Sequence, residues 1–188
     1  MSEKTRQIDN FNKIGNMPET WRQCAEDLLI SSCLLYNSYS SVDLTSLPVG
    51  AHVPDQGKIF GIIKMLRAMA LECLFKALWL KKGGKLAKDG KYVKIPGTND
   101  HNLLSLADRV SEKCGLSINS DDRELLKRLS LSISRGRYPI NKIWELTKTP
   151  PAGKVPAEWW RFPTDEQMFL SLLSRLTERL DSYSNGIK

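Results

Sequence analysis

The sequence predicts an all-α protein, an antiparallel bundle of about five helices with a small β-hairpin insertion near residues 85–95. Apolar residues recur at helical spacing in five separate segments of the 188-residue chain. Asp89-Gly90 stands between two short runs, a pattern typical of a tight hairpin turn. No apolar run approaches the ~20 residues that a membrane-spanning helix needs. We therefore expect one helical domain over residues 1–188, with no membrane association.

The first two predicted helices are separated by a long polar segment. The first helix covers residues 19–36, and residues 37–57, rich in Ser, Pro and Gly, are expected to form a loop. The second helix, residues 59–82, is apolar on nearly every side, which is typical of the central helix of a bundle. Gly83-Gly84 ends it, because glycine commonly terminates helices.

The remaining elements follow in order along the chain. Residues 85–95 predict a basic hairpin that projects from the bundle. Residues 102–114 have leucine and valine on one face, with Asp100 as the expected N-cap. Residues 121–134 begin with acidic side chains that suit the helix dipole, and the Arg-Gly-Arg-Tyr-Pro sequence that follows is expected to interrupt the helix. Residues 164–183 carry the last leucine stripe.

The basic residues are concentrated in two stretches of the chain, which has a net charge of +7. Residues 58–94 contain ten basic and two acidic residues, and residues 135–161 contain six and two. Such clusters suit an anionic partner, because Lys and Arg attract phosphates and release their counterions. The alternative is that these side chains are simply solvated and keep the protein in solution. The sequence leaves both interpretations open.

Cysteine and histidine usage points away from a metal site. Four cysteines lie far apart, and we expect free thiols in a reducing compartment, the cytoplasm. The polar N-terminus leads into no apolar segment of the kind that forms a secretory signal. The two histidines, His52 and His101, have no paired cysteines at ligand spacing. We therefore expect no metal and no cofactor.

Glu72 is a carboxylate in the middle of the most apolar helix. An unpaired buried charge is costly, so Glu72 needs a partner or must be protonated. Lys76, four residues later, can pair with it along the helix. The alternative is that Glu72 faces an arginine from another helix inside a cleft, which would make it a functional carboxylate.

Over residues 60–140 the chain resembles the HEPN family (higher eukaryotes and prokaryotes nucleotide-binding domains). Members of that family show Glu-x-x-x-Lys-Ala-Leu on a central helix, His-Asp-Leu-x-x-Leu at the next helix and a later Arg-Tyr-Pro turn. The matching segments here are Glu72-Cys73-Leu74-Phe75-Lys76-Ala77-Leu78, His101-Asn102-Leu103-Leu104-Ser105-Leu106 and Arg137-Tyr138-Pro139.

The resemblance implies an antiparallel helical bundle that forms a homodimer. Many family members are metal-independent ribonucleases of toxin–antitoxin or phage-defence systems, with a catalytic Arg followed four to six residues later by His. This chain departs from that pattern: the positions after Arg135 and Arg137 include Asn141 and Lys142 but no histidine. Neither an amide nor an ammonium group replaces imidazole as a proton shuttle near neutral pH.

We therefore expect a non-catalytic HEPN-like module that binds RNA, a nucleotide or a protein partner, in a prokaryotic defence or toxin–antitoxin context. The candidate phosphate-binding residues are Arg135, Arg137 and Lys142. The candidate base-stacking residues are Trp159, Trp160 and Phe162, unless these aromatics cover the open end of the bundle. Two alternatives remain. One is a metal-independent endoribonuclease with Arg135 and Glu72 as catalytic candidates, and the other is a dimeric scaffold protein.

Overall fold

The computed structural model describes residues 2–41, 43, 46, 51, 52, 54–99, 101–137 and 160–184, without the side chains of residues 57, 58, 134–137 and 184. The protein is mostly helical with one small antiparallel hairpin, as the sequence predicts. The elements are α1 (Glu3–Gly15), α2 (Pro18–Ser40), α3 (Asp55–Lys58), α4 (Phe60–Lys81), β1 (Ala87–Lys88), β2 (Lys91–Tyr92), α5 (Leu103–Cys114), α6 (Ser120–Arg137) and α7 (Thr164–Ser184).

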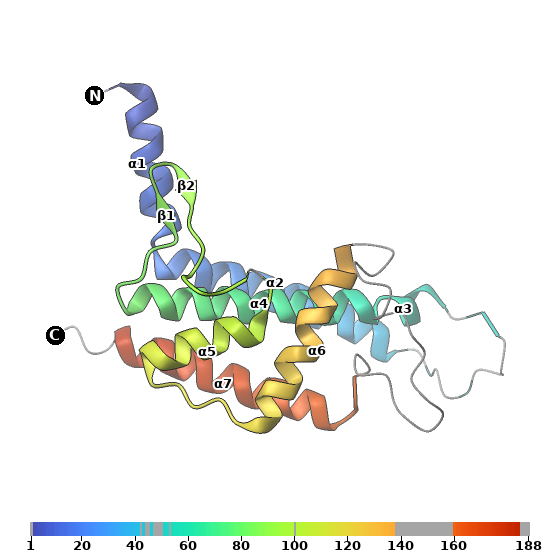
Figure 1. Ribbon diagram of the computed structural model, residues 1–188. Coiled ribbons are helices and arrows are strands. Elements are labelled where there is room, and N and C mark those ends of the chain that lie inside the picture. The colour runs from blue at the N-terminus through green and yellow to red at the C-terminus, as the bar shows by residue number, and fades with distance from the viewer. Residues whose placement is uncertain are drawn as a thin grey trace.

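Helix α4 forms the centre of the bundle. It packs against α2, α5, α6 and α7, and Figure 1 shows it running through the middle of the molecule. Every residue from 70 to 80 is buried, which explains why this segment is apolar on all sides. This stretch has no solvent face, so the polar residues it carries must find partners inside the protein.

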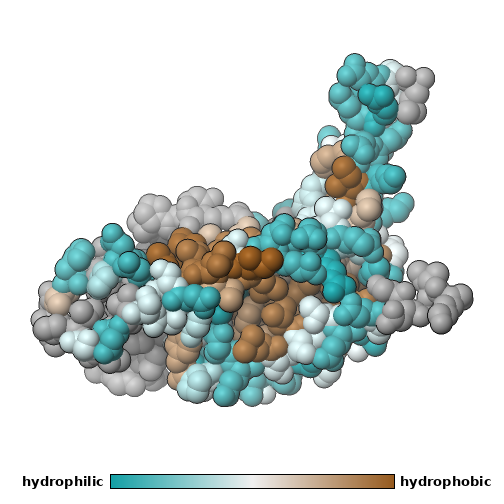
Figure 2. Space-filling model, turned by 180° about the vertical axis from the view of Figure 1, so that it is seen from behind, coloured by the Kyte–Doolittle hydropathy of each residue, from teal (hydrophilic) through white to brown (hydrophobic). Residues whose placement is uncertain are grey.

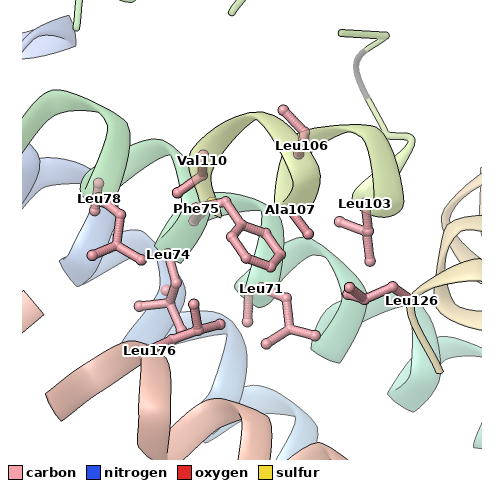
Figure 3. Close-up of a cluster of buried hydrophobic side chains, with 14 of the residues drawn as sticks. Leu71, Leu74, Phe75, Leu78, Leu103, Leu106, Ala107, Val110, Leu126 and Leu176 are labelled. Atoms are coloured by element: carbon pink, nitrogen blue, oxygen red, sulfur yellow. The ribbon is translucent and has the colours of Figure 1, made fainter. Parts of the chain in front are cut away.

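The core is rich in leucine, and most of its side chains come from α4, α5, α6 and α7. Figure 3 shows the α4 side chains meeting side chains of α5, α6 and α7. The labelled residues are Leu71, Leu74, Phe75, Leu78, Leu103, Leu106, Ala107, Val110, Leu126 and Leu176. Truncating a buried leucine of this kind to alanine typically costs about 2–5 kcal/mol, because a cavity remains.

Local signals in the sequence explain where several helices begin. Helix α5 begins after Asn102, whose side chain accepts a hydrogen bond from the Ser105 N–H at 3.1 Å, so the cap is Asn102 and not the expected Asp100. Asn119 and Asp122 cap α6 reciprocally, because each side chain accepts the backbone N–H of the other.

The hairpin has the expected turn. Asp89 and Gly90 both have positive φ, 53° and 73°, as the two central residues of a type I′ turn require. Lys88 pairs with Lys91 and Ala87 with Tyr92 in the antiparallel register.

Four features of the chain differ from the sequence-based expectation. Residues 3–15 form α1, which projects from the bundle beside the hairpin (Figure 1) and was not predicted. Helix α2 continues to Ser40, and the short α3 also lies within the expected loop. Helix α6 continues through the Arg-Gly-Arg sequence to Arg137, beyond its expected end at residue 134.

Candidate functional site

The candidate phosphate-binding residues lie at the edge of what the structure describes. Arg135 and Arg137 occupy the last turn of α6, and only their backbone is described. Lys142 lies outside the described residues, as does the stacking candidate Trp159. Their contacts with a ligand therefore stay predictions.

Glu72 lies in a buried polar cluster at the middle of α4. One carboxylate oxygen, Oε1, accepts a hydrogen bond from Lys76 Nζ at 2.7 Å, and the other, Oε2, lies 2.9 Å from His101 Nδ1. The Glu72 and Lys76 side chains are only 7% and 8% exposed, whereas the His101 side chain is 39% exposed. The pairing with Lys76 is the simpler of the two expected arrangements. The contact with His101 was not predicted.

Three other elements complete the polar cluster. Lys76 Nζ lies 4.7 Å from the ring centroid of Trp21 on α2 and 5.1 Å from that of Tyr92 on β2. Burial lowers the pKa of Lys76, but the Glu72 carboxylate and Tyr92 more than offset this effect, so the pKa is raised. His101 lies just before α5 and itself has a positive φ of 70°. From this position its ring contacts Glu72. The cluster thus joins α2, α4, the hairpin and the start of α5.

The geometry gives His101 and Glu72 the arrangement of a histidine–carboxylate dyad. A carboxylate oxygen is an acceptor, so the Nδ1 position of His101 carries the hydrogen in this contact. A histidine held in this way has a fixed ring orientation and tautomer. Because the ring is partly exposed, it borders solvent and can meet a ligand there. Imidazole is the proton-transfer group that the sequence lacks after Arg135 and Arg137.

Trp160 and Phe162 belong to an aromatic cluster at the opposite end of α4 from the hairpin. Trp160 packs on the hydrophobic core and lies 6.5 Å from the Phe169 ring centroid. Phe162 stacks on Tyr36 of α2 at 6.2 Å and contacts Phe60 at 5.6 Å, and it remains 47% exposed. Trp160 therefore mainly covers the end of the bundle, whereas Phe162 still presents a ring surface to solvent.

Part of the positive charge counted in residues 58–94 is internal. Arg67 is 6% exposed, and its guanidinium group forms two hydrogen bonds with the Glu166 carboxylate, at 2.5 and 2.9 Å. The same group lies 5.0 Å from the ring centroid of Phe169. Lys76 is likewise buried and paired. These two cations stabilise the fold, and only the remaining basic residues can meet an external anion.

The exposed positive charge gathers on a projecting unit that we call the arm, which consists of α1 and the hairpin segment 85–94. Lys85, Lys88 and Lys91 are exposed, and none of them has an ion-pair partner within the part of the chain that the structure describes. The same holds for Lys4, Arg6 and Lys13 of α1. The acidic residues of the arm are Glu3, Asp9 and Asp89. Figure 1 shows the arm standing away from the bundle.

Amide hydrogen bonds fasten α1 to the hairpin. The Asn16 side chain accepts the backbone N–H groups of Leu86 and Ala87, at 2.8 and 3.0 Å, and donates to the Ala87 carbonyl at 2.8 Å. Asn12 accepts the Gly90 N–H at 3.0 Å. The positive φ of residue 90 favours glycine, and an added Cβ there would lie 3.3 Å from the Ile8 side chain, a tight contact. These bonds hold the basic residues of α1 and the hairpin on one unit.

The bundle also presents exposed hydrophobic side chains. Figure 2 shows a hydrophobic area on the body of the molecule, on the side where α2 faces the viewer. Ile30 and Leu34, one helical turn apart on α2, are 59% and 67% exposed, and Leu170 of α7 is 53% exposed. An ion pair between Arg22 of α2 and Asp181 of α7 links these two helices at one end.

Comparisons with protein-family models, with curated proteins and with solved structures found no match. Within the described residues, no group of three or more His, Cys, Asp or Glu side chains is arranged to hold a metal ion. In the same part of the chain, no helix combines the length and hydrophobicity that crossing a bilayer requires.

Proposed function

We propose that this chain is a HEPN-like module that binds the phosphate backbone of RNA, with the arm as its main contact surface, and that it does not cut the RNA. The observation that carries the proposal is the set of exposed cations on the arm that have no partner in the described structure. Cations that are not neutralised by neighbouring carboxylates gain most from phosphate, because no existing ion pair must be broken. In this proposal Arg135, Arg137 and Lys142 add further phosphate contacts.

The polar cluster supports the HEPN-like part of the proposal. Two of the three motifs on which the resemblance depends are far apart in the sequence, at residues 72–78 and 101–106. Their characteristic residues, Glu72 and Lys76 in one and His101 in the other, are in direct contact. A shared structural role explains why these residue types occur together, because a buried glutamate needs two donors for its two oxygens.

A salt titration of RNA binding tests the proposal. Single-stranded RNA binding weakens with salt at a slope of about 0.7 per phosphate contact, so losing three contacts lowers the slope by about 2. We expect this change in the triple variant Lys85→Gln/Lys88→Gln/Lys91→Gln. The matched control, Arg109→Gln/Lys113→Gln/Lys127→Gln, removes the same charge from α5 and α6. An unchanged slope in the arm variant, or an equal loss in the control, would contradict binding through the arm.

A metal-independent endoribonuclease is the second candidate, and the His101–Glu72 contact is the observation that favours it. Metal-free cleavage needs a base for the 2′-hydroxyl and a cation for the developing phosphorane charge. His101 would be that base, oriented by Glu72, and Arg135 would stabilise the phosphorane. RNA incubated with the protein in a chelator distinguishes the two candidates. Intact RNA supports the binding module. Cleavage that is lost in His101→Ala and in Arg135→Ala would establish the ribonuclease.

We also propose a cytoplasmic homodimer, joined through exposed hydrophobic side chains of α2 and α7. An isologous dimer covers the same patch on both subunits. Ile30, Leu34 and Leu170 supply apolar area that the monomer leaves in water. Dimerisation places two arms on one particle, which would raise the avidity for a long RNA without any new contact.

A further inference from the structure

Two cysteines from different helices are in contact inside the bundle. The Sγ atoms of Cys24 on α2 and Cys73 on α4 lie 3.7 Å apart, with the Cys73 thiol donating to the Cys24 sulfur. Cys73 is 8% exposed, whereas Cys24 is exposed. The pair is therefore a surface thiol in front of a buried one.

The helices that carry the two thiols are held close together. The buried residues of α2 are Ala25 and Ser32, whose small side chains let the α2 backbone approach α4. A disulfide has a sulfur–sulfur distance of about 2.05 Å, so the two sulfurs must approach by about 1.7 Å. Side-chain rotation and a small helix shift can supply this approach without rearranging the bundle.

The surroundings give the two thiols different roles. Burial and the neighbouring Cys24 raise the pKa of Cys73, an effect that the nearby Lys76 ammonium partly opposes. Cys73 is thus held as a thiol and is shielded from solutes. Cys24 is the residue of the pair that an oxidant in solvent meets first, because Cys24 is exposed and Cys73 is buried. The geometry therefore makes Cys24 the cysteine that reacts with the oxidant and Cys73, with its sulfur 3.7 Å away, the one placed to resolve the product, while the raised pKa of Cys73 slows that second step.

We infer that Cys24 and Cys73 form a peroxide-sensitive dithiol site, in which hydrogen peroxide converts the two thiols into a disulfide that joins α2 to α4. In the first step the Cys24 sulfur attacks one peroxide oxygen, the O–O bond breaks, and Cys24 becomes a sulfenic acid as one water leaves. In the second step the Cys73 sulfur attacks the Cys24 sulfur and the S–O bond breaks. The hydroxide leaves with the Cys73 proton as a second water. The protein loses two electrons and two protons, and the peroxide is reduced to two waters.

Cys24 and Cys73 are 49 positions apart, so the disulfide would close a loop from the second turn of α2 to the middle of α4. Removing the freedom of such a loop from the unfolded chain raises the melting temperature of a protein of this size by roughly 10 °C. A thiol reductant cleaves the disulfide and therefore returns the melting temperature to its starting value.

The experiment treats the purified full-length chain with stoichiometric hydrogen peroxide and then blocks free thiols. Intact mass and peptide mapping are expected to show the loss of two hydrogen atoms per chain and a cross-linked pair of peptides containing Cys24 and Cys73. The melting temperature rises by roughly 10 °C and returns to the starting value after reduction. In Cys73→Ser, a sulfenic-acid probe is expected to label Cys24, because no second thiol resolves it.

Cys33→Ser is the matched control, because Cys33 is also an exposed cysteine of α2 but has no contact with another thiol in the described residues. This variant must form the cross-link as readily as the unchanged chain. Three results would overturn the inference: both cysteines of the pair remaining reduced, Cys24 oxidising without joining Cys73, or peroxide producing only disulfides between chains. None of these outcomes depends on whether the protein binds RNA.

Discussion

The buried polar cluster provides the sharpest prediction for stability. Replacing Glu72 by glutamine keeps the shape of the side chain but removes its charge. Glutamine can still accept from Lys76 with its oxygen, and its amide can donate to His101 Nδ1 if the imidazole changes tautomer, so the main loss is the negative charge beside Lys76. The Lys76 ammonium group, with a side chain 8% exposed, loses its carboxylate at 2.7 Å. Breaking a buried ion pair from one side costs about 3–5 kcal/mol, because an unpaired charge stays inside the protein.

The assay is urea unfolding followed by far-ultraviolet circular dichroism. A loss of about 3–5 kcal/mol is a large part of the stability of a typical domain and lowers the melting temperature by roughly 10 °C. The same substitution is then made together with Lys76→Met. We expect Glu72→Gln to cost clearly less in that background, because no buried ammonium group is left unpaired. The difference measures a coupling of about 1–3 kcal/mol.

A surface ion pair supplies the control. Glu124 and Lys127 approach to 2.5 Å, closer than Glu72 and Lys76, but both side chains are 56% exposed. Glu124→Gln is expected to change the unfolding free energy by no more than the error of the measurement, because water screens exposed pairs. If Glu72→Gln proves as harmless as Glu124→Gln, burial does not govern the energetics of this cluster and the reasoning fails.

Two further predictions concern pH and association. Because the folded-state pKa of Lys76 is raised, its contribution to stability is fully present below the ordinary lysine pKa of about 10.4 and is lost as the pH rises through the folded-state value. The free energy of unfolding, measured at a series of alkaline pH values, is expected to fall with pH in the unchanged chain and to fall less steeply in Lys76→Met. An equal dependence of this free energy on pH in the two proteins would contradict the prediction. Light scattering at micromolar concentration is expected to report a dimer that Ile30→Glu/Leu34→Glu converts to a monomer with an unchanged circular dichroism spectrum. A monomeric unchanged chain would end the dimer proposal.

The bundle was predictable from the sequence because its signals are local. The central helix has apolar residues on all sides, and the hairpin turn needs two residues that tolerate positive φ, which Asp89 and Gly90 supply. Helix α1 gave no comparable signal, since none of its residues is buried. Asn16, at the end of α1, bonds to the backbone N–H groups of Leu86 and Ala87, which lie 70 and 71 positions later. A pattern of neighbouring residues cannot predict such long-range contacts.

The candidate site was predictable only in part. The charge and spacing of Glu72 and Lys76 indicated a pair, because residues four apart on a helix are neighbours. The contact with His101 depends on the fold, which brings the turn before α5 against the middle of α4. The count of basic residues also overstated the exposed charge. Arg67 looks like a surface residue in the sequence, but its partner Glu166 lies 99 positions away.

The attachment of α1 to the hairpin has a consequence for how the molecule responds to stress. The bonds made by Asn12 and Asn16 are amide hydrogen bonds, each with a net value of about 1 kcal/mol, and no residue of α1 is buried. The hairpin segment, in contrast, is anchored in the bundle by Leu86, which lies fully buried in the hydrophobic core. Helix α1 is therefore expected to detach from the hairpin and re-dock many times while the hairpin and the bundle stay folded. Amide hydrogens of α1 would then exchange well before those of α4, and a protease would trim α1 and leave a folded bundle. The cations of α1 thus stand on a part of the arm that opens more readily than the hairpin.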